Sequence, residues 1–213
     1  MADKQHWETV YQTKAPDAVS WYRPHLDRSL AMIERVTPDR NTAILDVGGG
    51  ASTLVDDLLA RGYRDLSVLD ISAEALDIAR RRLGEASNTA QWLAADLLDI
   101  SLQTARYHVW HDRAVFHFLT EPDQRASYVR QLTHALKPGG YVMLATFGPN
   151  GPVKCSGLDT VRYDAEGLVC ELGDGFTLID STQESHATPF GTAQQFLYTL
   201  FQRKPDQHGE VIE

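Results

Sequence analysis

The segment AILDVGGG occupies residues 43–50, an apolar run that ends in three consecutive glycines. The run predicts a buried strand over 43–47. An amphipathic helix is predicted directly after the glycines, because Leu54, Leu58 and Leu59 lie on one helical face. A glycine turn between a strand and a helix lets a ligand approach the backbone without meeting a Cβ atom, although glycines also serve ordinary tight turns. The segment therefore predicts a small-molecule cofactor site.

Beyond this segment, strand-like and helix-like stretches alternate, which predicts a parallel sheet with helices packed on it. Further strands are expected over 66–69, 91–94, 107–110 and 141–146, and the last helix of this series carries an apolar face that runs to Leu136 and is stopped by Pro138, Gly139 and Gly140. Later come a short helix near 164–172 and strands over 176–183 and 195–202, joined through 186–191. These two strands predict an antiparallel hairpin at the sheet edge. Helices over 3–13 and 25–36 precede the sheet as candidates for a lid.

The composition is that of one ordinary globular domain. The chain has 213 residues, of which 43% are hydrophobic, enough for a sizeable core. The net charge of -9 and the absence of a Lys/Arg stripe disfavour nucleic acid as a substrate. The polar amino-terminal residues and the lack of a long apolar run predict a cytoplasmic protein without a membrane segment. Two cysteines and eight scattered histidines predict neither a disulfide scaffold nor a metal site.

Carboxylates follow two further strands. Asp70 ends the second strand and precedes Ile71, at a position where a carboxylate can accept both hydroxyl protons of a ribose. Asp96 follows the third strand and is a candidate acceptor for an adenine amino group, or else a cap of the next turn. A nicotinamide enzyme shares the glycine turn and the acid, but Thr53 occupies the third glycine position of that motif, which disfavours a dehydrogenase.

Taken together, four ordered motifs resemble the class I S-adenosylmethionine-dependent methyltransferases. They are the segments 46–50, 69–70, 95–96 and 136–140. The resemblance implies a Rossmann-like three-layer α/β sandwich, with a mostly parallel seven-stranded sheet, an antiparallel carboxyl-terminal hairpin and amino-terminal helices as a lid. It also implies a single domain over 1–204, divided into a helical cap (1–40), a cofactor-binding core (41–147) and a substrate-side loop with the hairpin (148–204), followed by a loose tail over 205–213.

The resemblance further implies S-adenosylmethionine as the cofactor and S-adenosylhomocysteine as the product. The implied cofactor contacts are divided by the part of the cofactor that they meet: its amino-acid end, its ribose and its adenine. They are, in that order, Asp46 with Gly48, Gly49 and Gly50; Asp70 with Ile71; and Asp96 with Leu97. His111, at the end of the fourth strand, is a further candidate contact.

The substrate side is predicted where the fourth strand ends, because parallel α/β sheets present ligands at that edge. His111 and His117 are candidate general bases, Asp112 is a candidate to orient a cationic group, and Arg113 is a candidate to hold a substrate carboxylate through two nitrogens. Alternatively, Asp112 and Arg113 pair with each other as scaffold and His117 is a packing residue.

Further candidates for the substrate site lie outside this strand. They are Trp21, Tyr22, His25, Cys155 and His186. Aromatic residues near the amino terminus, Trp7 and Tyr11 among them, either bind a ligand or pack the first helices onto the sheet. The leading hypothesis is methylation of a small metabolite such as a carboxylate, a thiol or an amine. The alternatives are a protein-lysine methyltransferase, whose acidity and aromatic residues suit an ammonium group, and a non-catalytic cofactor-binding module.

Overall fold

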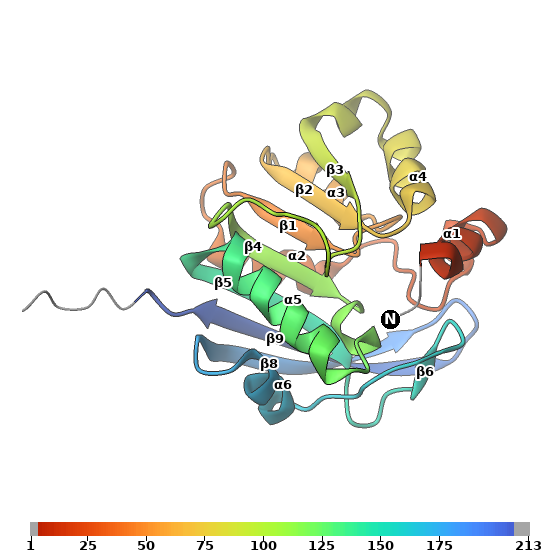
Figure 1. Cartoon of the computed structure of the whole chain (residues 1–213). Helices are drawn as coiled ribbons and strands as arrows, with labels where there is room; N and C mark the ends of the chain where they lie inside the picture. The colour runs from red at the N-terminus through yellow and green to blue at the C-terminus, as the bar shows by residue number, and fades with distance from the viewer. Residues whose placement is uncertain (1–3, 207–213) are drawn as a thin grey trace, which may run out of the picture.

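A seven-stranded sheet forms the centre of the computed structural model, which describes residues 4–206 (Figure 1). Its strands follow the order β3-β2-β1-β4-β5-β9-β8. In chain order they are β1 (Ile44–Val47), β2 (Leu66–Asp70), β3 (Ala90–Ala94), β4 (Tyr107–Arg113), β5 (Leu136–Phe147), β8 (Phe176–Ala187) and β9 (Ala193–Arg203). The first five are parallel, whereas β9 runs antiparallel to both β5 and β8. This is the predicted Rossmann-like arrangement with its terminal hairpin.

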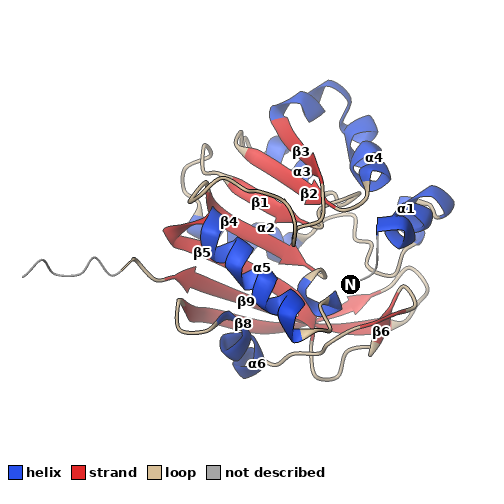
Figure 2. Ribbon diagram, in the orientation of Figure 1, coloured by secondary structure: helices blue, strands red, loops and turns tan. Residues whose placement is uncertain are grey.

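Helices cover both faces of the sheet (Figure 2). They are α1 (Lys4–Thr13), α2 (Asp27–Val36), α3 (Leu54–Ala60), α4 (Ala73–Leu83), α5 (Pro122–Ala135) and α6 (Ala165–Leu172). Apolar side chains of α2, α3 and α4 pack on one face, and those of α5 and α6 pack on the other. Every residue of β1 and β2 is buried, and six of their nine residues are apolar, as expected for strands that are covered on both faces. Within residues 4–206, none of the helices combines the length and the apolar character needed to cross a bilayer.

Several element boundaries differ from the sequence-based expectation. Helix α5 ends at Ala135, because Leu136 already pairs with Tyr107 in the sheet, so the segment 138–140 lies inside β5 and does not stop the helix. Strand β8 continues to Ala187, which places His186 opposite Gln194 in the hairpin and not in its turn. A small hairpin of β6 (Lys154–Cys155) and β7 (Leu158–Asp159) was not expected. Residues 1–3 of the predicted cap and residues 207–213 of the predicted tail lie outside the described residues.

The glycine turn after β1 has a backbone that other residues adopt only under strain. Gly48 has a φ of +65°, and a Cβ atom on it would lie 2.1 Å from Val115 Cγ2. Its N–H donates to the carbonyl of Leu69 over 2.7 Å, which ties the turn to β2. Gly50 has a φ of +35°, and its Cβ would lie 2.6 Å from the carboxylate of Asp70. The turn therefore brings the backbone and this carboxylate to the same edge of the sheet.

Helix α1 is attached to the start of α4 through Glu8. The Glu8 carboxylate accepts hydrogen bonds from the Ser72 hydroxyl (3.0 Å) and from the backbone N–H groups of Ala73 (2.9 Å) and Glu74 (3.2 Å). The first N–H groups of a helix have no partner inside it, so Glu8 caps α4 from a distant element. Burial by itself raises the pKa of Glu8, but these hydrogen bonds together lower it below its usual value.

We expect Glu8→Ala to lower the free energy of unfolding by about 1 kcal/mol, the usual effect of losing a helix cap. Urea denaturation at neutral pH measures this change. Gln5→Ala is the matched control, because Gln5 lies on the same helix and is exposed. Equal stability of the two variants would show that the contact with α4 contributes nothing.

Candidate active site

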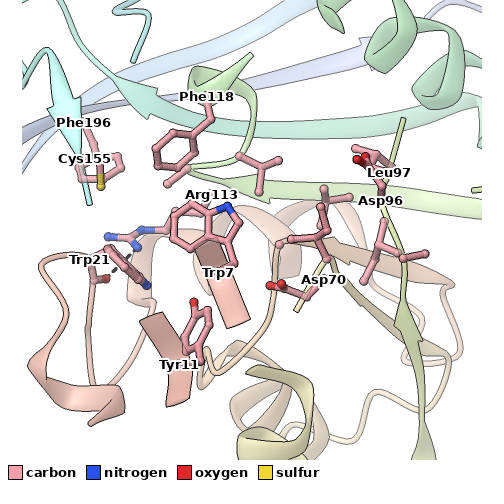
Figure 3. A pocket seen from close by; sticks show the side chains of 17 residues that line it. Trp7, Tyr11, Trp21, Asp70, Asp96, Leu97, Arg113, Phe118, Cys155 and Phe196 are labelled. Carbon is pink, nitrogen blue, oxygen red and sulfur yellow. Dashed lines mark hydrogen bonds between the residues drawn. The ribbon is translucent and has the colours of Figure 1, made fainter. Parts of the chain in front are cut away.

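A pocket opens at the carboxyl edge of the sheet, between the strand ends and α1. Side chains of two kinds line it at opposite ends (Figure 3). We call one end the carboxylate end, which comprises Asp70, Ile71, Asp96 and Leu97. We call the other the aromatic chamber, which comprises Trp7, Tyr11, Trp21, Arg113, Phe118, Cys155 and Phe196. The pocket is therefore divided between a polar acidic region and a largely apolar one.

Asp70 is the buried acid of the carboxylate end. It accepts the N–H of Ser72 over 2.8 Å. Burial raises the pKa of Asp70 to about 7, and the neighbouring carboxylates of Asp46 and Glu8 raise it further against the lowering effect of backbone hydrogen bonds. A carboxylate held in this way gains from hydroxyl donors, which would stabilise its charged form. Asp96 lies nearby and also accepts the N–H of Leu98 over 2.9 Å, so it caps the following turn as well as lining the pocket.

A second pocket adjoins the glycine turn on the side of α2 and is lined by Asp46, Gly48, Gly49 and His111 among others. Asp46 Oδ1 lies 2.7 Å from His111 Nδ1, whereas the other carboxylate oxygen is buried and has no hydrogen-bond partner among the described residues. His111 Nε2 lies 2.8 Å from the hydroxyl of Ser29. Both ring nitrogens of His111 are thus engaged, and its position orients Asp46.

Aromatic edges and faces form most of the aromatic chamber. The ring of Trp7 packs edge-on against Trp21 and Phe118, at centroid distances of 5.8 and 5.2 Å. Tyr11 packs edge-on against Trp21 at 6.4 Å. Burial raises the pKa of Tyr11 far above its usual value, and the charge of Asp70 adds to this effect. The Tyr11 hydroxyl therefore stays protonated and acts in the chamber as a polar but uncharged group.

Arg113 is held at the far end of the aromatic chamber. Its Nε donates to the Tyr198 hydroxyl and its Nη1 to the carbonyl of Trp21, both over 3.0 Å. The guanidinium lies 4.7 Å from the ring centroid of Phe196, as in a cation-π contact. Its Nη2 is buried and has no hydrogen-bond partner among the described residues. One nitrogen, and not the two-nitrogen edge expected from the sequence, therefore remains for a ligand.

The other charged candidates of the β4 end do not line either pocket. The Asp112 carboxylate accepts from the Tyr128 hydroxyl (2.6 Å) and from the N–H groups of Val115 and Phe116, with a closest approach of 2.9 Å for Val115 and 3.1 Å for Phe116. Burial raises its pKa to about 6. Asp112 thus fixes the turn after β4, and the alternative that it pairs with Arg113 is wrong, because each is bound to other groups.

His117 is likewise buried, and it does not itself line the pocket. Its Nδ1 accepts the N–H of Phe147 over 3.2 Å, and its ring lies against the rings of Phe118 and Phe147. Burial lowers the pKa of His117 to about 3, and the charge of Arg113 contributes. His117 is therefore a neutral packing residue, as the alternative interpretation of the sequence had it.

Of the remaining substrate candidates, Trp21 and Cys155 line the aromatic chamber and Tyr22 lines the second pocket. Burial raises the pKa of the Cys155 thiol to about 11, so it is uncharged at neutral pH. His186 is buried behind the chamber, where Nε2 lies 2.7 Å from the Ser20 carbonyl. Burial lowers its pKa, although the hydrogen bond to Ser20 opposes that change.

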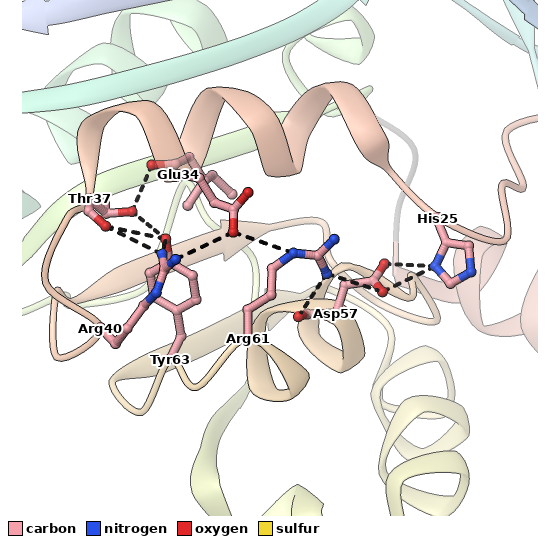
Figure 4. Close-up of polar contacts among 8 residues, drawn as sticks. His25, Glu34, Thr37, Arg40, Asp57, Arg61 and Tyr63 are labelled. Carbon is pink, nitrogen blue, oxygen red and sulfur yellow. Dashed lines mark hydrogen bonds and ion pairs between the residues drawn. The ribbon is translucent and has the colours of Figure 1, made fainter.

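His25 lies outside the pocket. Its Nδ1 is 3.1 Å from the Asp57 carboxylate, in a polar network on the outer surface of α2 and α3 that also includes Arg61 and Glu34 (Figure 4). The structure therefore does not bring His25 to the other substrate candidates.

Three residues near Arg113 were not among the sequence-based candidates: Phe118, Phe196 and Tyr198. Phe196 and Tyr198 lie on β9, and both point toward Arg113 because alternate residues of a strand share one face. The sequence holds no local signal for this meeting, since β4 and β9 are separated along the chain and joined only through β5.

The known proteins that this chain resembles are methyltransferases. Residues 44–140 match the model of a methyltransferase domain. Human EEF1A lysine methyltransferase 2 is 20% identical over 194 residues, which cover 84% of this chain and 76% of that protein. Malonyl-[acyl-carrier protein] O-methyltransferase of Halalkalibacterium halodurans is 29% identical over 185 residues, which cover 78% of this chain and 67% of that protein.

Among solved structures, one similar fold is the Burkholderia thailandensis 1,6-didemethyltoxoflavin-N1-methyltransferase with bound 1,6-didemethyltoxoflavin and S-adenosylhomocysteine. Its TM-score is 0.69 at 17% identity, and the match covers 94% of this chain and 87% of that chain. The domain match and the shared fold agree with the four sequence motifs. The chain carries a methyltransferase domain over residues 44–140 and is an S-adenosylmethionine-dependent methyltransferase with a Rossmann-like fold, and its cofactor is S-adenosylmethionine.

Proposed function

We propose that this enzyme transfers the methyl group of S-adenosylmethionine to a small molecule bound in the aromatic chamber. The observation that carries the proposal is the charge of that chamber. Among its described lining residues Arg113 is the sole cation, and the two lining carboxylates, Asp70 and Asp96, belong to the other end of the pocket. A lysine ammonium group would enter a chamber that holds a positive charge and no carboxylate, which is unfavourable.

The residues of the carboxylate end and of the glycine turn fit the cofactor. In our proposal Asp70 accepts the ribose hydroxyls, while Asp96 and Leu97 meet the adenine. Asp46 lies at the amino-acid end, where its unpartnered buried oxygen suits an ammonium group. Gly48, Gly49 and Gly50 let the backbone approach that end. The cofactor supplies a methyl group already activated by a positively charged sulfur.

What remains for the protein is to position the acceptor and exclude water. Trp7, Trp21 and Phe118 supply apolar walls for this purpose, and α1 closes the chamber through its contact with α4. His111 serves as a positioning residue for Asp46. In the same proposal the segments 1–40, 41–147 and 148–204 act as cap, cofactor core and acceptor side.

A protein-lysine substrate is the second candidate, favoured by one observation. The chamber is built of indole and phenyl rings, and such rings also bind ammonium groups. The relatives include both chemistries, since one is named a lysine methyltransferase and another an O-methyltransferase of an acyl carrier protein.

Transfer of a radiolabelled methyl group into a cell extract tests the proposal. After incubation with the enzyme and labelled S-adenosylmethionine, the extract is separated into macromolecular, small-molecule and volatile fractions. We expect the label in the small-molecule or volatile fraction. Label confined to base-stable sites on protein would instead support the lysine substrate, and an extract incubated without enzyme provides the background.

A further inference from the structure

The charge of Arg113 is not balanced by an ion pair within the described residues. Two of its three guanidinium nitrogens donate to neutral groups: Nε to the Tyr198 hydroxyl and Nη1 to the Trp21 carbonyl. The third, Nη2, has no hydrogen-bond partner among the described residues. Arg113 is partly buried, and its Nη2 atom is fully buried. Burying such a nitrogen without a counterion is costly, and the cost falls when an anion binds beside it. Arg113 also lines both pockets, at the junction of the aromatic chamber with the glycine turn.

The surroundings of Arg113 hold its side chain in one place. Phe196 lies beneath the guanidinium, and Tyr198 and Trp21 fix two of its nitrogens. Figure 3 places it beside Trp21 and Cys155, at the opposite end of the pocket from Asp70 and Asp96. An anion that binds there lies among aromatic walls and away from the acidic groups.

None of the described residues that line the aromatic chamber removes a proton at neutral pH. Burial raises the pKa of Tyr11 and of Cys155, and Arg113 is a permanent cation. His111 has both ring nitrogens engaged, and His117 does not line the pocket. An acceptor methylated here must therefore bind in a form whose accepting atom carries no proton that has to be removed.

We propose that the acceptor is a carboxylic acid with an apolar body, bound as its carboxylate through Arg113 and methylated on a carboxylate oxygen. This inference rests on the proposed small-molecule function. A carboxylate is ionised at neutral pH, since its usual pKa is about 4. Oxygen anions accept hydrogen bonds from a guanidinium strongly, whereas sulfur is a weak acceptor, which favours a carboxylate over a thiolate.

The transfer step balances without any proton. A lone pair of the carboxylate oxygen forms the new C–O bond while the C–S bond breaks and its electron pair returns to sulfur. The carboxylate becomes a neutral methyl ester, and the sulfonium becomes a thioether. Arg113 then faces a neutral product, so it holds the acid more strongly than the ester and favours product release.

Binding of three small probes tests the recognition step independently of turnover. Benzoate, benzamide and benzylamine share one ring and differ in charge, and each is titrated by calorimetry into protein saturated with S-adenosylhomocysteine. We expect benzoate to bind about tenfold or more tighter than benzamide, and benzylamine to bind least. Arg113→Met should abolish this preference, Arg113→Lys should retain part of it, and the exposed Arg130→Met should leave it unchanged. Thermal unfolding of each variant checks that it folds.

Three outcomes would overturn the proposal. The first is equal binding of benzoate and benzamide to the wild-type protein, and the second is a preference for benzylamine. The third is a loss of S-adenosylhomocysteine affinity in Arg113→Met that matches the loss of benzoate affinity, because that result would assign Arg113 to the amino-acid end of the cofactor.

The labelled extract gives a chemical test of the same inference. Strong base releases methanol from methyl esters, whereas methyl groups on sulfur or nitrogen are stable to it. We expect the small-molecule label to become volatile after treatment with sodium hydroxide. Base-stable label in that fraction would overturn the carboxylate but leave the small-molecule function standing, while label on protein lysine would overturn the function itself.

Discussion

Asp70→Asn is expected to weaken the binding of S-adenosylhomocysteine about 10- to 100-fold, which corresponds to about 1–3 kcal/mol for the loss of charged hydrogen bonds. The affinity of the wild-type protein should also weaken as pH falls through about 7, because Asp70 takes up a proton there. The variant should lack this pH dependence. Calorimetric titrations across that pH range measure both effects, with Asp77→Ala as a control from the exposed side of α4.

The same substitution weakens cofactor binding but should raise the free energy of unfolding at neutral pH and above. The pKa of Asp70 is higher in the folded protein without cofactor than in the unfolded chain, so its ionisation opposes folding increasingly as pH rises from about 4 to about 7. Above that range Asp70→Asn should unfold at a higher urea concentration than the wild type. Cofactor affinity equal to that of the wild type would remove Asp70 from the cofactor site, whatever the stability.

His117→Asn is expected to reduce the sensitivity of the fold to acid. The pKa of His117 is about 3 in the folded protein, whereas an unfolded histidine has a pKa of about 6.5. Its contribution to stability is therefore complete above about pH 6.5 and is lost as pH falls, at up to about 1.4 kcal/mol per pH unit. The Asn side-chain oxygen can replace Nδ1 as acceptor for Phe147 and does not titrate.

Urea denaturation at about pH 7.5 and about pH 4.5 provides the measurement. The useful quantity is the difference between the wild type and His117→Asn, because Asp70 and Asp112, whose pKa values are raised, shift the pH dependence in the opposite sense in both proteins. We expect this difference to change by about 2–3 kcal/mol in favour of the variant at the lower pH. A constant difference would mean that His117 takes up its proton without unfolding.

The sequence predicts the half of the site whose residues follow strands directly. The glycine turn is continuous with β1, and Asp70 and Asp96 follow β2 and β3 at the shared edge of a parallel sheet. Such positions can be predicted from one sequence, because they depend on local patterns and on the rule that parallel sheets bind ligands at the carboxyl ends of their strands. The fold class followed for the same reason.

The aromatic chamber was much less predictable, because its members meet only through tertiary packing. Phe196 on β9 meets Arg113 on β4 across the intervening strand β5, and Trp7 meets Phe118 from α1. The end of α5 was misplaced for a related reason: Leu136 continues the apolar helical spacing, but pairing with Tyr107 draws it into β5. Competition between helical periodicity and strand pairing is decided by the neighbouring strand, which the local pattern does not contain.

The two ends of the pocket come from different parts of the chain. Strands β1 to β3 and their loops build the carboxylate end, whereas the aromatic chamber comes from α1, the loop after it, the β4 end, the 154–159 hairpin and β9. In the function that we propose, substitutions in the second group change which molecule is accepted and leave the donor contacts of the carboxylate end in place. Trp7, Trp21, Phe118 and Phe196 are therefore the natural positions for a directed-evolution library aimed at new acceptors, and descendants of one ancestral enzyme can diverge in substrate along the same route.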